Sequence, residues 1–256
     1  MSATLDSAVR HERSVCGLVA DTITFSSVDG PGNRFVVFLQ GCNFDCLACH
    51  NPQTIPGNGP VDGRAPRRTS VDELLERFRA AAPFLSGVTV SGGEPTQQPV
   101  FLRGLFTAIK ADPALARLDC FVDSNGACDL EVWESLAPVM DAAMIDLKCL
   151  DPRIHRALTG HSNDRVLASI RRLHDLGRLY EVRLLVIDGL NDGHELMHQT
   201  AEWLAAIDPH MRIKLIAFRD HGVRPHDPPL VEPGADTMES IAAQFRDIAP
   251  FDVHLV

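Results

Sequence analysis

Short runs of apolar and β-branched residues alternate along the chain with segments whose apolar residues recur at helical spacing. The short runs predict strands at 34–40, 87–91, 119–123, 142–147, 180–187, 212–218 and, at the C-terminus, 252–256. The segments between them predict helices at 71–82, 101–111, 130–136, 163–176, 194–207 and 238–248. A strand and a helix that alternate about six times indicate βα units around a parallel sheet, with the helices outside it.

Local signals mark several element boundaries and the extent of the domain. Ser70, followed by Glu73, has the spacing of a capping box, and Asp236 is the expected cap of the last helix. Residues 1–15 are polar, and we expect an N-terminal lead-in over 1–20. Because neither a repeat nor a long linker divides the rest, we expect one domain over 21–256.

Composition and charge exclude several classes of protein. The chain has 256 residues and a net charge of −10, and its lysines and arginines are scattered, so we expect no nucleic-acid partner. No apolar run approaches ~18 residues, which argues against a membrane span. The polar N-terminus predicts no secretory signal, and we expect a cytoplasmic monomer. In that reducing compartment, the seven cysteines are not expected to form disulfides.

Three of the cysteines form a compact motif. Cys42, Cys46 and Cys49 have the spacing C-x3-C-x2-C and follow the first predicted strand directly. Three thiolates on one loop can hold a cubane of four irons, and they leave one iron without a protein ligand. That iron can bind a substrate, which a cluster with four cysteine ligands does not readily do. The spacing therefore favours chemistry at the cluster over storage of an electron alone.

Other interpretations of these cysteines remain open. Residues 46–50 also fit the C-x-x-C-H haem attachment, but that requires export and leaves Cys42 unused. Zinc on three cysteines and His50 is chemically reasonable, although a ligand directly after Cys49 makes tetrahedral closure awkward. The remaining cysteines lack paired spacing and are expected to be small buried apolar side chains, at positions 16, 120, 128 and 149.

Polar motifs follow several predicted strands. Two glycines in 91–94 let the backbone approach a ligand closely, and Glu94 places a carboxylate beside them. Similar motifs occupy 123–126 and 144–148. In (β/α) barrels the loops after the strands converge at one face, which carries the active site. We therefore expect one site from the residues that follow successive strands: Cys42–Cys49, Glu94, Asp123, Lys148 and Arg219.

The cysteine motif followed by His50-Asn51-Pro52, with VDGPGNRF upstream at 28–35, resembles the radical S-adenosylmethionine (SAM) superfamily. More narrowly it resembles the activating enzymes of glycyl radical enzymes, over most of the chain. The resemblance implies a partial (β/α)6 barrel, a [4Fe–4S] cluster on the three cysteines, and reductive cleavage of SAM to a 5′-deoxyadenosyl radical. It also implies hydrogen abstraction from a glycine of a partner glycyl radical enzyme, with flavodoxin or ferredoxin as electron donor.

The resemblance also implies roles for individual residues. SAM contacts are expected from Ala48, His50, Gly92, Gly93, Glu94, Asp123, Asp146, Lys148, Arg183 and Arg219. A monovalent cation is expected on Asp123, Ser124, Asp146 and the Met144 carbonyl, since oxygen ligands suit a hard cation. Substrate contacts are expected from Asp29, Arg183 and His221.

Three features depart from the family pattern. Ala48 stands where the superfamily usually carries an aromatic residue. Arg219 occupies the position of a SAM-contacting histidine, with His221 two residues later. The stretch between His50 and the helix at 71 leaves no room for an additional ferredoxin-like domain. Two alternatives therefore stay open: a radical SAM enzyme acting directly on a small metabolite or peptide, and a zinc-binding or electron-transfer protein without SAM cleavage.

Overall fold

The computed structural model describes residues 15–56 and 65–256 of the chain. Their contacts form two compact units. The N-terminal unit extends to Asn43 and includes Gln53–Ser124 and Asp129–Ala143. The C-terminal unit consists of Phe44–Pro52, Asn125–Cys128 and Met144–Val256. Most of the expected lead-in lies outside the described residues, and the single domain expected over 21–256 stays a prediction.

The strands of the N-terminal unit form a mixed sheet with the order β3-β1-β2-β4-β5. Strands β2, β4 and β5 run parallel, whereas β1 is antiparallel to β2 and β3. The parallel strands are the most apolar and the most buried, as a sheet covered by helices requires. The bounds are β1 (Cys16–Ser26), β2 (Arg34–Leu39), β3 (Arg67–Ser70), β4 (Gly87–Gly92) and β5 (Asp119–Ser124).

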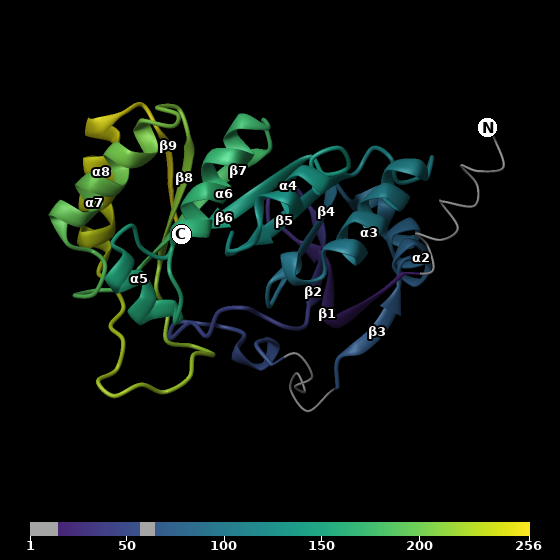
Figure 1. Ribbon diagram of the computed structural model, residues 1–256, viewed down its shortest axis with the longest axis horizontal. Coiled ribbons are helices and arrows are strands. Elements are labelled where there is room, and N and C mark those ends of the chain that lie inside the picture. Colours follow the sequence, from purple (N-terminus) through teal and green to yellow (C-terminus); the bar gives the residue numbers. More distant parts are fainter. Residues whose placement is uncertain (1–14, 57–64) are drawn as a thin grey trace. The chain divides into compact units, whose positions relative to one another are not determined.

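Helices flank these strands, as Figure 1 shows for α2 and α3. The Ser70 side chain accepts a hydrogen bond from the Glu73 N–H at 3.2 Å, which confirms the predicted cap of α2. Leu74, Leu75 and Phe78 of α2 are fully buried. The helical elements are α2 (Val71–Ala81), α3 (Pro99–Ala111) and α4 (Leu130–Leu136), with 3-10 turns η1 (Pro52–Thr54), η2 (Ala82–Phe84) and η3 (Pro95–Gln97).

In the C-terminal unit β7, β8 and β9 are parallel, and α7 packs against α8 (Figure 1). The end of β6 lies beside β7, where the Leu147 N–H donates to the Arg183 carbonyl at 2.9 Å. The strands are β6 (Ala142–Asp146), which begins in the N-terminal unit, β7 (Leu179–Val186), β8 (Arg212–Ala217) and β9 (Asp252–Leu255). The helices are α5 (Pro152–Thr159), α6 (Asp164–Asp175), α7 (His194–Ala205) and α8 (Ala235–Ile248).

Several local features differ from the sequence prediction, among them strand β3, which was not predicted. Strand β1 begins at Cys16, inside the expected lead-in, and most of its side chains are only partly buried or exposed, so its apolar signal is weak. Helix α5 was not predicted, although Asp151 caps it and Gly160 ends it in the left-handed conformation. The predicted cap at Asp236 is wrong: Gly234 is the N-cap of α8 and Asp236 lies in its first turn.

The four cysteines outside the motif were expected to be buried. Cys120, Cys128 and Cys149 are buried, which confirms the prediction for these three. Cys16 is exposed, so the prediction is wrong at that position. The physical reason is that Cys16 is the first residue of β1, a strand that leaves much of its surface open to solvent.

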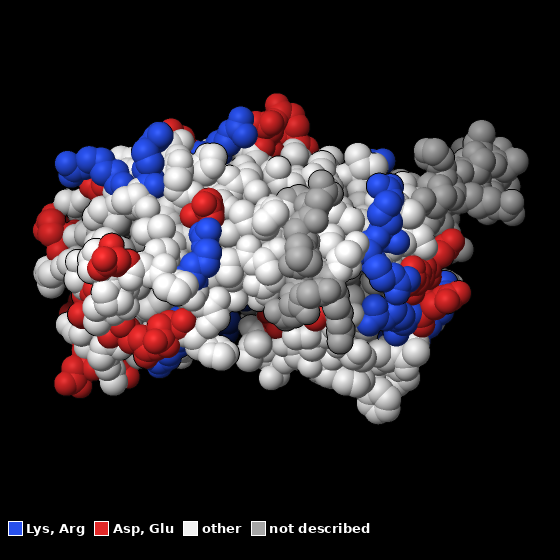
Figure 2. Space-filling view, turned by 90° about the horizontal axis from the view of Figure 1, so that it is seen from below, with Lys and Arg blue, Asp and Glu red and all other residues white. Residues whose placement is uncertain are grey.

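Charged side chains of opposite sign adjoin one another on the face shown in Figure 2. Arg67 pairs with Glu73 and Arg212 with Asp252, at nitrogen–oxygen distances of 2.6 Å and 3.0 Å. Such exposed pairs contribute little to stability. Within the described ranges, none of the helices combines the length and the apolar character that crossing a bilayer demands.

Candidate functional site

Cys42 belongs to the N-terminal unit and lies three residues after β2. Two backbone hydrogen bonds hold the chain there: the Gly41 N–H donates to the Thr54 carbonyl at 2.8 Å and the Cys42 N–H to the Ile55 carbonyl at 3.1 Å. The first predicted ligand therefore has a defined backbone position.

The other two cysteines lie on residues 44–50, which we call the cysteine loop, in the C-terminal unit. The Asp45 N–H donates to the Thr159 carbonyl at 3.2 Å, and the Leu47 N–H donates to the Leu158 carbonyl at 2.8 Å. These carbonyls belong to the last turn of α5, where backbone acceptors have no partner within the helix. The end of α5 thus anchors the cysteine loop.

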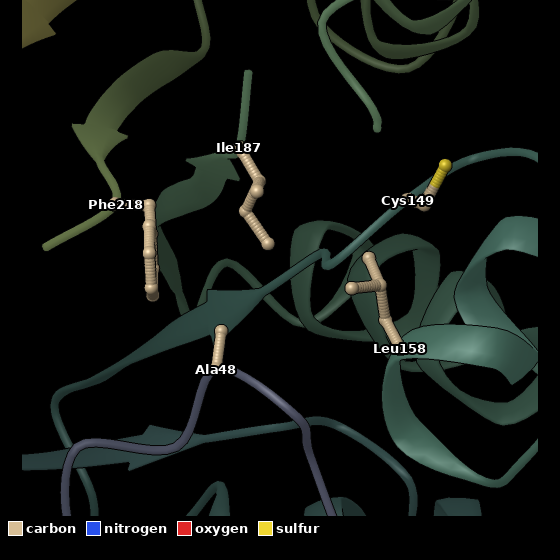
Figure 3. Packing of buried hydrophobic residues seen from close by; sticks show 5 residues of the cluster. All are labelled: Ala48, Cys149, Leu158, Ile187 and Phe218. Atoms are coloured by element: carbon tan, nitrogen blue, oxygen red, sulfur yellow. The ribbon is translucent and has the colours of Figure 1, made fainter. Parts of the chain in front are cut away.

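Ala48, between the two cysteines, is part of the apolar core of the C-terminal unit. It packs in one cluster with Leu158, Ile187 and Phe218, and its methyl group points toward them in Figure 3. Val223 packs against the same cluster. A larger aromatic side chain would need space that these residues fill. The departure from the family pattern at position 48 is therefore matched by local packing, and a SAM contact of Ala48 stays a prediction.

The cysteines of the motif form no disulfide, and the thiols of Cys46 and Cys49 lie in mixed electrostatic surroundings. Burial raises the pKa of Cys46 to about 11. Burial also raises the pKa of Cys49, against an opposing hydrogen bond from the Asn51 N–H and the cations of Lys148 and Arg224. At neutral pH these two thiols are protonated in the metal-free chain, so cluster assembly must release protons from them. The two cations favour the thiolate form that a cluster requires.

Three cysteine thiols are the donor set that a [4Fe–4S] cluster needs when its fourth iron has no protein ligand. None of the described cysteines forms a disulfide, and those of the motif are half-buried rather than sealed in the core. No three of the described His, Cys, Asp and Glu side chains are grouped as ligands of a single ion. Each cysteine of a cubane binds a different iron, so its thiolates need not converge on one point.

The Gly92-Gly93-Glu94 motif follows β4 in the N-terminal unit. The Glu94 N–H donates to the Gly41 carbonyl at 2.7 Å, which places the motif beside the residue that precedes Cys42. Glu94 is fully buried, and its Oε1 accepts hydrogen bonds from the Thr96 N–H, the Thr96 hydroxyl and the Ser124 hydroxyl, at 3.0, 2.7 and 2.8 Å. The carboxylate is therefore held in one orientation.

The predicted cation ligands are divided between the two units. Asp123 and Ser124 end β5 in the N-terminal unit, where Asp123 accepts a hydrogen bond from the Ser91 hydroxyl at 3.0 Å. Met144 and Asp146 belong to β6 in the C-terminal unit. The cation site stays a prediction.

Asp146 and Lys148 form an ion pair after β6, with 2.7 Å between Nζ and Oδ2. Burial alone would raise the pKa of Asp146, but the Lys148 and Arg183 cations outweigh it and hold that pKa below its ordinary value. Burial alone would lower the pKa of Lys148, and the Asp146 carboxylate reverses this shift. Both groups are charged at neutral pH, so Lys148 presents a cation near Cys46 and Cys49.

Arg183 is buried within β7 and forms a structural ion pair, an alternative that an arginine in an apolar strand leaves open, but the sequence did not single out its partner Glu181. Its Nε donates to Glu181 Oε1 at 2.6 Å, and its Nη2 lies 2.8 Å from the Met144 sulfur. Glu181 is only 1% exposed and also pairs with Lys214 and Arg212, at 3.3 and 3.4 Å. The available signal was period-2 alternation, which places residues 181 and 183 on one face of the strand.

Replacing Glu181 with glutamine should lower the free energy of unfolding by roughly 3 kcal/mol, because the buried Arg183 loses the carboxylate that accepts from its Nε. Chemical denaturation of the metal-free chain measures this. Asp252→Asn is the matched control: it removes an exposed carboxylate from Arg212 and should cost under about 1 kcal/mol. If both variants lost the same free energy of unfolding, the buried pair of Glu181 and Arg183 would be no more important than an exposed pair.

The loop after β8 reaches the cysteine loop within the C-terminal unit. The His50 ring Nε2 lies 2.9 Å from the Arg219 carbonyl oxygen, while the exposed Arg219 side chain pairs with Glu232 at 3.0 Å. His221 is exposed. Arg224 contacts the cysteine loop from the same segment, as does His226. Arg224 and His226 could not be recognised from the sequence, because a contact between two distant loops leaves no periodic signal.

Asp29 precedes β2, whereas Cys42 and Glu94 follow β2 and β4. Its side chain accepts a hydrogen bond from the Ser26 hydroxyl, and its carbonyl accepts one from the Thr89 hydroxyl at 2.7 Å. Because β2 and β4 are parallel, Asp29 lies near the N-terminal ends of these strands, whereas Cys42 and Glu94 lie near their C-terminal ends. Its predicted substrate contact stays a prediction.

Comparisons with known proteins agree with this arrangement. The family model for the radical SAM superfamily matches residues 36–202. The chain is 38% identical over 212 residues to a pyruvate formate-lyase-activating enzyme of Streptococcus mutans, covering 81% of this chain and 80% of that protein. It is 34% identical over 223 residues to a putative glycyl-radical enzyme activating enzyme of Haemophilus influenzae, covering 79% and 82%.

A solved structure shows the same fold. A radical SAM methyltransferase from Sphaerobacter thermophilus aligns with a TM-score of 0.63 at 18% identity, over 87% of this chain and 66% of its own. The predicted α/β fold of parallel strands with flanking helices is thereby confirmed. The cofactors of this family are a [4Fe–4S] cluster and SAM. The chain belongs to the radical SAM superfamily and, within it, to the activating enzymes of glycyl radical enzymes.

Proposed function

We propose that this chain activates a glycyl radical enzyme by taking a hydrogen atom from one glycine of that partner. The observation that carries the proposal is the C-x3-C-x2-C loop in a chain whose relatives, matched over about four-fifths of their length, are named activating enzymes. When bound, the reduced cluster and SAM together supply a 5′-deoxyadenosyl radical. The protein's own part is to hold, orient and shelter the reacting groups.

We assign the cluster to Cys42, Cys46 and Cys49. The anchoring of Cys42 near η1 and of the cysteine loop on α5 supports this assignment, because ligands on a fixed backbone lose less freedom when they bind. Nearby positive charges support it further, since Lys148 favours the thiolates of Cys46 and Cys49 and Arg224 favours that of Cys49.

We assign the SAM amino group to Glu94 with Gly92 and Gly93. A carboxylate fixed by the Thr96 and Ser124 hydroxyls needs no reorganisation to accept an N–H donor. Further SAM contacts are proposed for the residues that the family motif matches: Ala48, His50, Asp123, Asp146, Lys148, Arg183 and Arg219. The remaining proposals are a monovalent cation on Asp123, Ser124, Asp146 and the Met144 carbonyl, and substrate contacts of Asp29, Arg183 and His221.

The proposal includes an external one-electron donor, flavodoxin or ferredoxin, and a cytoplasmic location. None of the cysteines in the described ranges forms a disulfide, as expected in a reducing compartment.

The test is anaerobic. The chain, reconstituted with its iron–sulfur cluster, is mixed with a reductant, SAM and a glycyl radical enzyme from the same genome. We expect a glycyl radical in the electron paramagnetic resonance spectrum and 5′-deoxyadenosine in matching amounts. A partner in which the radical-bearing glycine is replaced by alanine is the control and should show no radical. Formation of 5′-deoxyadenosine without a radical on any such partner would instead favour a small metabolite or peptide as substrate.

A further inference from the structure

The segment 219–226, which we call the strap, crosses the cysteine loop inside the C-terminal unit. Its contacts fall on consecutive residues of that loop. Arg224 Nη2 donates to the Asp45 carboxylate at 2.6 Å and to the Cys46 carbonyl at 3.0 Å. His226 Nε2 lies 2.6 Å from the Leu47 carbonyl, so the ring donates its N–H there.

Two further contacts continue the strap along the loop. The His50 ring donates from Nε2 to the Arg219 carbonyl at 2.9 Å. Gly222 has a φ of +80°, and a Cβ at this position would lie 3.2 Å from the His50 carbonyl oxygen. The positive φ and this close approach both favour glycine here. The strap therefore follows the loop from residue 45 to residue 50.

Apolar packing holds the strap in the same place. Val223 packs against the core cluster that contains Ala48 and Phe218, shown in Figure 3 without Val223. The cysteine loop is thus fixed on one side by the α5 carbonyls and on another by the strap, while its cysteines keep free thiols.

We propose that Arg224 and His226 are positioning residues that hold the cysteine loop in its cluster-binding conformation before any cluster is present. Both side chains bind backbone carbonyls, at Cys46 and Leu47, rather than thiols. They therefore restrict the loop and leave the ligands available. This inference rests on the proposed function for its purpose, but the ordering of the metal-free loop can be measured alone.

The experiment is amide hydrogen exchange on the metal-free full chain, followed by mass spectrometry of peptides within residues 42–52. Arg224→Ala and His226→Leu each remove a strap contact. The N–H groups of Asp45 and Leu47, which bond to α5, should exchange about tenfold faster in both variants. His226→Gln keeps an N–H donor for the Leu47 carbonyl and should restore the slow exchange.

Arg153→Ala is the matched control, because it removes an arginine of α5 whose side chain is 91% exposed and leaves the loop contacts intact. Its exchange should equal that of the unaltered chain. The proposal is overturned if exchange in residues 42–52 stays unchanged in both strap variants. It is also overturned if protection falls equally throughout the C-terminal unit, since the strap would then be an ordinary part of the core.

A second measurement separates this inference from the function itself. After anaerobic loading, the strap variants should lose iron to a chelator about tenfold faster than the Arg153→Ala control, a size expected for residues that support metal ligands. If the unaltered chain binds no cluster, the proposed function fails, while the exchange of the metal-free chain still decides the role of the strap.

Discussion

Replacing Cys46 with alanine is expected to abolish 5′-deoxyadenosine formation and leave the chain folded. The substitution removes one of three thiolates, so the cluster lacks a ligand. Folding should persist, because the three proposed ligands are only half-buried and do not belong to the apolar core of either unit. Single substitutions away from core packing usually change stability by less than about 1 kcal/mol. The measurements are product chromatography after anaerobic reduction with SAM, and thermal unfolding of the metal-free chain.

Cys16→Ala is the control for this experiment. Cys16 is exposed at the start of β1, outside the motif, and its loss should affect neither product nor bound iron. The assignment of Cys46 as a ligand is refuted if the Cys46→Ala variant still forms product at the unaltered rate. Zinc in place of iron in protein purified without oxygen would refute the cluster itself.

Replacing Gly93 with alanine is expected to destabilise the N-terminal unit by roughly 3 kcal/mol or more, because the added methyl overlaps backbone. The new Cβ would collide with the Gly41 carbonyl and lie 2.9 Å from the Thr54 oxygen. Neither atom is the end of a flexible side chain that could move aside. The Glu94 N–H bond to the Gly41 carbonyl would break with the shift, so a folded remnant should also lose SAM affinity.

Gly193→Ala is the matched control, since a Cβ at this position would meet nothing within 4 Å. Its φ of −56° suits any residue, and because Gly193 is the N-cap of α7 the cost should stay within about 1 kcal/mol. Chemical denaturation of the metal-free chain measures both variants. If Gly93→Ala were as stable as Gly193→Ala, the close approach of the 92–94 motif to Gly41 would be wrong.

The alternation of apolar and polar segments predicted most of the architecture. The parallel strands at 34–39, 87–92 and 212–217 appear within one residue of their expected bounds, because buried parallel strands are nearly continuous apolar runs. Strand β1 was missed because its exposed face dilutes that signal. Helix α5 was missed because two of its three buried residues, His155 and Thr159, are polar and give no apolar periodicity, although Asp151 and Gly160 bracket it.

Local motifs of the site could be recognised from the sequence, whereas contacts between residues distant in the chain could not. The spacing of the cysteines and the glycines at 92–93 is local, and local motifs can be recognised without a fold. Glu181 looks like an ordinary residue of a strand, and only packing reveals that Arg183, Arg212 and Lys214 share it. The strap is a contact between residues 45–50 and 219–226, and loop closure over such a distance leaves no local pattern.

By itself the sequence determined the superfamily of this protein, its α/β class, and the three cysteines proposed as cluster ligands, since these depend on periodicity and on spacing within short segments. Tertiary structure alone decided how the cysteine loop is held, why alanine fits at position 48, and which carboxylate neutralises Arg183. The physical reason is that burial and hydrogen bonding are pairwise properties of residues distant in the chain. Such pairs become visible only once the backbone has brought them into contact.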